Sequence, residues 1–127
     1  MTGVRGEDRQ TMDPDLLRYR DELRVQVVPA RAEVHVVPVG SLDLHTVGPI
    51  EEAVRELRES GFETIVVDLR GLDFLDSSGL GMLLSLRNTA RRTDHKLEII
   101  RGPRLVQRVF ELTATIALFD WRDGSDG

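Results

Sequence analysis

Cysteine is absent from the sequence, which excludes disulfides and thiolate metal sites. Long apolar runs are absent as well, since none approaches the roughly 18 residues that a membrane-spanning helix needs. The opening residues, MTGVRGEDRQTMDPD, lack the apolar stretch of a secretory signal. Together these absences favour a protein of the cytoplasm.

Residues that hold phosphate or metal ions are also scarce. Lys96 is the only lysine, and it follows no glycine-rich loop, so a P-loop is excluded. His35, His45 and His95 lie far apart and lack the spacing of histidine metal motifs. The net charge of -5 argues against a generic nucleic-acid binder. We therefore expect no cofactor, no metal site and no direct contact with nucleic acid or membrane.

The composition suits one globular domain, because 40% of the 127 residues are hydrophobic and 31% are charged. Residues 1–22 are polar and charged, and we predict a flexible N-terminal extension there. A short helical piece is predicted within it at DPDLLRYRDEL (13–23), with Asp13 as its cap. Residues 123–127 form a polar tail, so the folded domain is expected to span 23–122.

Valines alternate with other residues in RVQVVPA (24–30) and EVHVVPVG (33–40), which is the period of a β-strand. Only a short turn separates the two runs, so they predict an antiparallel hairpin. FETIVVDLRGL (62–72) and KLEIIRG (96–102) are short apolar runs typical of strands covered on both faces. A last short strand is predicted in TIALFDW (115–121).

Three stretches between these strands have the spacing of helices. Apolar residues recur every three or four positions in 47–60, in 80–92 and in 103–112, where Pro103 suits the first turn. Strands and helices therefore alternate along most of the chain. This order predicts an α/β fold, a single domain in which a mixed β-sheet packs against α-helices through right-handed crossovers.

Two polar segments are expected to meet at one edge of this sheet. GSLDLHT (40–46) follows the second predicted strand, and LDFLDSSGLG (72–81) follows the third. Ligands and reactive groups gather outside the carboxyl ends of the strands in open α/β sheets. The side chains that this places on one rim are Asp43, Asp73, Asp76, Ser77 and Ser78.

Enzyme chemistry at this rim is not favoured. A nucleophilic serine needs a base and an oxyanion hole, and the GxSxG elbow is missing. His45 is the only candidate base nearby, and nothing in the sequence directs it at a serine. The carboxylates are typical of turns and need not bind a metal. We therefore expect a protein without catalysis of its own.

Two interpretations of the serines stay open on the residues alone. They could simply cap a helix, because serine and aspartate are favoured at helix starts. They could instead form a phosphorylation switch, since a phosphate adds about -1.5 to -2 charges and free helical N–H groups can stabilise it. Gly79 and Gly81 weaken the simple cap, because each costs close to 1 kcal/mol in a helix relative to alanine.

The segment VVDLRGLDFLDSSGLGMLLSL (66–86) closely resembles the signature of STAS domains of the anti-sigma factor antagonist family. The upstream GSLDLHT resembles the turn that precedes the first main helix of that family. The resemblance covers about residues 24–120 and implies a STAS fold for 23–122.

The resemblance also implies a function. Unphosphorylated family members bind an anti-sigma factor that is a GHKL-type serine kinase, and thereby release a sigma factor. The kinase phosphorylates the first serine of D-S-S-G, which is Ser77 here, and a serine phosphatase reverses the step. The residues that match partner-binding positions are Asp43, Asp76, Ser77, Ser78, Gly79 and Leu80.

Two departures from the family pattern bear on this expectation. Ser41 stands where relatives often carry an acidic residue, and the polar end after Trp121 is short where many relatives have another helix. An alternative function is a STAS scaffold or transport-accessory module that binds a nucleotide or protein partner at the same rim. The intact D-S-S-G favours the antagonist.

Overall fold

The computed structural model describes residues 23–30 and 33–124. The predicted N-terminal extension (1–22) and hairpin turn (31–32) lie outside these residues. So does the predicted helical piece at 13–23, except for Leu23, which begins strand β1. The described elements, in chain order, are β1 (Leu23–Ala30), β2 (Glu33–Leu42), α2 (Val47–Glu59), β3 (Thr64–Asp68), the 3-10 turn η2 (Leu69–Gly71), β4 (Leu72–Leu75), α3 (Ser77–Arg92), β5 (Lys96–Ile100), α4 (Arg104–Leu112), the 3-10 turn η3 (Ile116–Leu118) and β6 (Asp120–Arg122).

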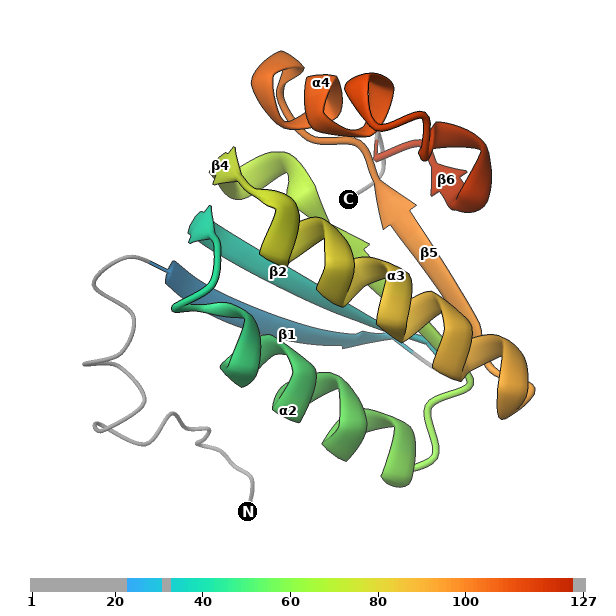
Figure 1. The fold of residues 1–127 in the computed structure, drawn as a ribbon. Coiled ribbons are helices and arrows are strands. Elements are labelled where there is room, and N and C mark those ends of the chain that lie inside the picture. The colour runs from blue at the N-terminus through green and yellow to red at the C-terminus, as the bar shows by residue number, and fades with distance from the viewer. Residues whose placement is uncertain (1–22, 31–32, 125–127) are drawn as a thin grey trace.

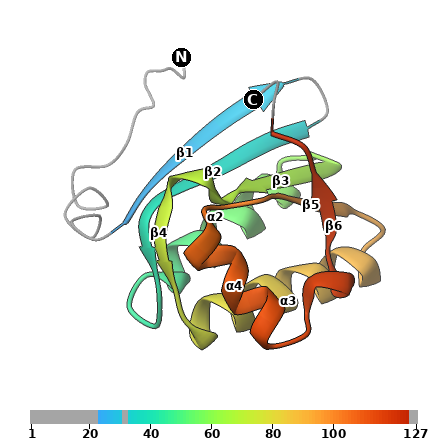
Figure 2. The same ribbon diagram turned by 90° about the horizontal axis from the view of Figure 1, so that it is seen from above.

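The strands form one mixed sheet in the order β1-β2-β3-β5-β6, and β4 pairs with the end of β2. β1 and β2 are antiparallel, as the alternating valines predict, while the other pairs are parallel. The predicted α/β class with a mixed sheet is confirmed. The helices α2, α3 and α4 lie on the same side of the sheet (Figures 1 and 2).

The core lies between this helical layer and the sheet. Alternate residues of β2 such as Val34 and Val36 are fully buried there, together with Val67 of β3. α2 contributes Ile50 and Val54, which are one turn apart and both fully buried. α3 adds a broader apolar surface, consisting of Leu80, Met82, Leu83, Leu86 and Ala90. The 3.6-residue spacing of the sequence therefore predicts the buried helix faces correctly.

The predicted strand at 62–72 is wrong in one respect. It is two strands, β3 and β4, with the turn η2 between them. The Asp68 carboxylate accepts from the Arg70 amide at 3.0 Å, and this local bond makes the turn. β3 pairs with residues 33–36 of β2, and β4 pairs with residues 40–42 further along the same strand. The turn η2 therefore joins two strands that both pair with β2.

Two other predicted boundaries also change. Helix α3 begins at Ser77, three residues before the predicted start at Leu80, because Asp76 caps it. The predicted strand at 115–121 is mostly η3, followed by the short β6. In the last helix Pro103 is the N-cap rather than part of the first turn.

Candidate functional site: the rim at the start of α3

The two predicted segments meet at the carboxyl end of β2, where the Asp76 amide donates to the carbonyl oxygen of Leu42 at 3.2 Å. The Ser41 hydroxyl donates to the Asp73 carboxylate at 3.3 Å. Figure 1 shows the loop before α2, the end of β4 and the start of α3 side by side. The sheet therefore does bring these segments to one rim.

Asp76, and neither serine, caps helix α3. Its carboxylate oxygen Oδ1 accepts from the amides of Ser78 at 2.9 Å and Gly79 at 3.1 Å. Its carbonyl accepts from the amide of Leu80 at 3.0 Å. The interpretation of the serines as caps is thus wrong. The free N–H groups that were expected to stabilise a phosphate do not include those of Ser78 and Gly79, since the Asp76 carboxylate already binds them.

Ser77 is the first residue of α3, and its side chain is exposed. Its hydroxyl makes no hydrogen bond within the described part of the chain. Ser77 does not cap the helix, so its hydroxyl is available to a partner or a modifying enzyme. Ser78, the next residue, is only half-exposed.

Gly79 and Leu80 are buried, so neither offers a side-chain surface to a partner. A Cβ on Gly79 would lie 2.5 Å from Cδ1 of Leu75 and 2.7 Å from the carbonyl oxygen of Leu42. Close contact of α3 with the end of β2 therefore requires glycine at this position. The predicted role of these two residues in partner binding remains a prediction, and any such role would act by holding Ser77 in place.

The Asp43 loop is built by local hydrogen bonds. The Asp43 carboxylate accepts from the His45 amide at 2.9 Å, which closes an Asx turn. Thr46 is 3% exposed, donates its hydroxyl to the Ser41 carbonyl at 2.9 Å and accepts from the Asp43 amide at 2.9 Å. Thr46 thus fixes the loop beneath Asp43, whose own side chain is half-exposed.

Two exposed hydrophobic residues of this rim escape sequence reasoning. Leu44 is 68% exposed and Phe74 is 50% exposed. A register shift in the β2–β4 pairing skips Asp73, so Leu72 and Leu75 are both buried and Phe74 turns outward. The pattern LDFLD predicts that Phe74 is a core residue. Its exposure follows only from the bulge in the β2–β4 pairing.

The candidate base and the carboxylates of the rim are placed as follows. His45 is exposed and donates no hydrogen bond to Ser77 or Ser78 within the described residues. No group of three or more histidine, aspartate or glutamate side chains in residues 23–30 and 33–124 is placed to hold a metal ion. In the same ranges, no helix is long and apolar enough to cross a membrane.

The most strongly paired charges lie on the sheet face without helices, away from the rim. Arg122 of β6 binds both carboxylate oxygens of Glu33 on β2, at 2.8 and 2.9 Å, and also lies 2.7 Å from Glu98 of β5. The hydrogen bond from Arg122, with one from His35, lowers the pKa of Glu33 to about 2. This cluster ties the last strand to the second.

Asp68 forms a second pair on the same sheet, with Arg70. Asp68 is 5% exposed, and burial works to raise the pKa of its carboxyl. Hydrogen bonds from the side chain and amide of Arg70 outweigh burial, so the pKa is lowered. This pair supports the turn between β3 and β4, and so places the end of β4 beneath the rim.

Comparisons with known proteins identify the fold. The family model described as "Mlab, STAS domain" matches residues 25–115. The anti-sigma-B factor antagonist of Staphylococcus aureus is 30% identical over 87 residues, covering 68% of this chain and 81% of that protein. The chain belongs to the STAS-domain anti-sigma factor antagonist family. The antagonist of Staphylococcus epidermidis matches this STAS domain at 28% identity over 87 residues, with the same coverage of both chains.

Solved structures share the STAS fold at lower identity. An anti-sigma factor antagonist from Mycobacterium paratuberculosis has a TM-score of 0.71 and 20% identity, covering 84% of this chain and 90% of that one. The unphosphorylated form of the antagonist SpoIIAA has a TM-score of 0.68 and 22% identity, covering 81% and 91%. The predicted STAS fold is thus confirmed.

Proposed function

We propose that the chain is an anti-sigma factor antagonist controlled by phosphorylation of Ser77. The unphosphorylated protein binds an anti-sigma factor with GHKL-type serine kinase activity, and a sigma factor is released as a result. Phosphorylation by that kinase ends the interaction, and a serine phosphatase restores it. The chain is in this scheme a substrate and a binding protein.

The position of Ser77 carries this proposal. Its exposed hydroxyl lies at the start of α3 and has no hydrogen bond within the described residues. Asp76 supplies the helix cap, so modification of Ser77 need not disturb the fold. The names of the curated relatives, anti-sigma-B factor antagonists, support the partner class.

The surroundings of Ser77 also suit a docking surface. Leu44 and Phe74 expose apolar area on the same rim, at 68% and 50%. Such residues lose water contact when a partner covers them, which is the usual source of binding energy at an interface centre. Asp43 and Asp76 add negative charge beside them, so the kinase surface that fits here is apolar with basic groups at its border.

The cap at Asp76 determines how a phosphate on Ser77 would act. The amides of Ser78 and Gly79 already bind the Asp76 carboxylate, so they cannot also hold the phosphate. The phosphate would add about -1.5 to -2 charges next to an existing carboxylate and face outward. A partner docked over the rim would then meet repulsion and buried uncompensated charge, without a change of fold.

The experiment is phosphorylation of the full chain by its cognate anti-sigma kinase with ATP, followed by intact-mass analysis. We expect one added phosphate on the wild type and on Ser78→Ala, and none on Ser77→Ala. Ser78→Ala is the matched control because it removes the neighbouring hydroxyl of the same helical turn. Modification of Ser77→Ala at the wild-type level would overturn the assignment of the site.

A second function has one observation in its favour. The family model that matches the chain carries the name Mlab beside STAS domain. A scaffold or transport-accessory module would bind its nucleotide or protein partner at this rim without needing the hydroxyl of Ser77. A genomic neighbourhood with transporter genes, and no small GHKL kinase gene, would favour this function over the antagonist.

A further inference from the structure

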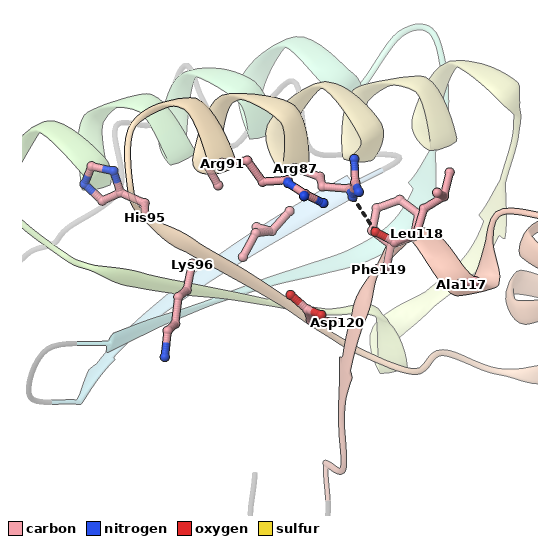
Figure 3. Close-up of a pocket in the computed structure, with 10 residues that line it drawn as sticks. Arg87, Arg91, His95, Lys96, Ala117, Leu118, Phe119 and Asp120 are labelled. Carbon is pink, nitrogen blue, oxygen red and sulfur yellow. Dashed lines mark hydrogen bonds between the residues drawn. The ribbon is translucent and has the colours of Figure 1, made fainter.

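A cavity of about 180 Å³ lies far from Ser77, between the second half of α3, the start of β5 and the η3–β6 segment (Figure 3). Its polar lining residues are Arg87, Arg91, His95, Lys96 and Asp120, and in Figure 3 the amino group of Lys96 points away from the two arginines. The protein as a whole carries a net charge of -5. A basic cavity on an acidic protein is a local reversal of charge that favours an anion.

Arg87 and Arg91 are one helical turn apart on α3, and both guanidinium groups lie over the cavity in Figure 3. Like charges at this spacing repel each other. The Nε of Arg87 is held by the carbonyl oxygen of Leu118. Arg91 has neither a hydrogen bond nor an ion pair to any residue of the described part. Arg91 is exposed, so its positive charge faces water and is accessible to an anionic ligand.

Another cavity in the described part of the chain shows a different arrangement. It has a volume of about 320 Å³ and is also lined by arginines, among them Arg70 and Arg122. Arg70 forms an ion pair with Asp68, and Arg122 forms ion pairs with Glu33 and Glu98. The third arginine, Arg101, lies over the ring of Trp121, 5.1 Å from its centroid. Two of the three arginines of that cavity are thus neutralised by carboxylates, whereas Arg91 has no carboxylate partner among the described residues.

The floor of the cavity at Arg91 is apolar. Ala90 is 2% exposed, and Leu97 and Phe119 are each 7% exposed. The volume of 180 Å³ corresponds to about six water molecules at roughly 30 Å³ each, which is smaller than a drug-sized site. It is sufficient for an oxyanion group and a few further heavy atoms.

We propose that this cavity binds a small organic oxyanion, with its phosphate or carboxylate group between Arg87 and Arg91 and its apolar part on Phe119 and Leu97. Arginine is the side chain best suited to such groups, because its planar guanidinium donates two parallel hydrogen bonds. The site is distinct from the rim. Ser77 lies ten residues before Arg87, which is about 15 Å along the helix axis.

The test is a titration of the full chain followed by ¹H–¹⁵N NMR, with three probes: inorganic phosphate, acetate and phenyl phosphate. We expect saturable shifts at the amides of Arg91, Leu97 and Asp120. Phenyl phosphate should bind more tightly than inorganic phosphate, because its ring covers the apolar floor. The comparison of acetate with phosphate shows which oxyanion is preferred. The absence of saturable shifts at these amides with all three probes would overturn the proposal.

Arg91→Gln is the decisive variant, because Arg91 has no described partner and its loss should leave the fold intact. We expect the affinity for phenyl phosphate to fall about tenfold, as for the loss of one charged hydrogen bond. Arg92→Gln is the control, since it removes the same charge from the same last turn but lies outside the cavity. An equal loss in both variants would mean general charge attraction and would refute the site. Circular dichroism melting curves show whether either variant alters the fold.

Discussion

Gly79 of α3 packs directly on Leu42 of β2, so closely that a Cβ at position 79 would lie 2.7 Å from the Leu42 carbonyl oxygen. The same oxygen accepts from the Asp76 amide at 3.2 Å. The first turn of α3 is therefore pressed against the sheet edge that carries the rim. Ser77 is held at the surface because the residues on either side of it are fixed in this way.

The first prediction concerns this contact. Gly79→Ala places a methyl group against the backbone of β2, and we expect the free energy of unfolding to fall by about 1–3 kcal/mol. Gly81→Ala is the matched control in the same helix, since a Cβ there meets nothing within 4 Å. That variant should gain stability, by up to about 1 kcal/mol, through helix propensity. Urea unfolding followed by circular dichroism measures both, and equal effects would contradict the packing argument.

The second prediction separates the cap from the serine. Asp76→Ala removes the acceptor for two amides and should lower stability by about 1 kcal/mol. Ser77→Ala removes a hydroxyl without a described partner and should stay within about 0.5 kcal/mol of the wild type. Thermal unfolding of the two variants gives the comparison. If Ser77→Ala lowered stability as much as Asp76→Ala does, Ser77 would have to contribute to the helix cap.

The third prediction concerns the apolar residues of the rim. Phe74→Ala and Leu44→Ala should each weaken binding of the anti-sigma factor by about tenfold or more, as for residues near an interface centre. Their stability should change little because both side chains are half or more exposed. Leu112→Ala is the control, since Leu112 is 72% exposed on α4. Titration calorimetry that finds the same loss for all three variants would argue against docking at the rim.

Binding of Ser77→Asp is the fourth prediction. The added charge lies beside the Asp76 carboxylate, so we expect the affinity for the anti-sigma factor to fall well below that of Ser77→Ala. Ser77→Asn is the neutral control of nearly the same shape. Equal affinities for the Asp and Asn variants in titration calorimetry would contradict a mechanism based on charge repulsion, whatever the site of phosphorylation.

The fifth prediction is a pH dependence of stability. Glu33 has a pKa lowered from 4.5 to about 2 in the folded protein, mainly by the hydrogen bonds of Arg122 and secondly of His35. A lowered carboxyl pKa adds stability that is complete above pH 4.5 and is lost as the pH falls toward 2. Because both partners are partly in contact with water, we expect about 1 kcal/mol.

Acid unfolding of Glu33→Gln tests this expectation. The variant should be less stable than the wild type near neutral pH, and the difference should shrink as the pH falls through the range of 4.5 to 2. Glu59→Gln, a change of an exposed carboxylate in α2, serves as the control. A difference that does not depend on pH would contradict the role of the Glu33–Arg122 pair.

Sequence patterns predict the parts of this fold that depend on neighbours in the chain. The alternating valines of 24–30 and 33–40 predict the hairpin, and the helical spacing predicts α2 and α4 with small errors at their ends. The cap escapes prediction because serine and aspartate are both good caps, and only the geometry at Asp76 decides between them.

Features that depend on distant residues could not be predicted. The bulge at Asp73 arises where β4 pairs with β2, some thirty positions earlier, and it explains the exposure of Phe74. The ion pair between Glu33 and Arg122 joins residues 89 positions apart. The position of the rim could be predicted from the sequence, whereas the exposure of its apolar residues could not.

The pairing of β6 also provides a natural reporter of folding. Trp121, the only tryptophan, lies next to Arg122. Its ring packs edge-on against that of Phe110, with 5.0 Å between the ring centroids, and its indole N–H donates to the carbonyl oxygen of Ile116. Because the Glu33–Arg122 pair joins residues 89 positions apart, it is a non-local contact, and we expect it to form late in folding. Fluorescence of the unmodified protein in stopped-flow refolding would therefore follow the arrival of the last strand, while far-UV circular dichroism follows the helices.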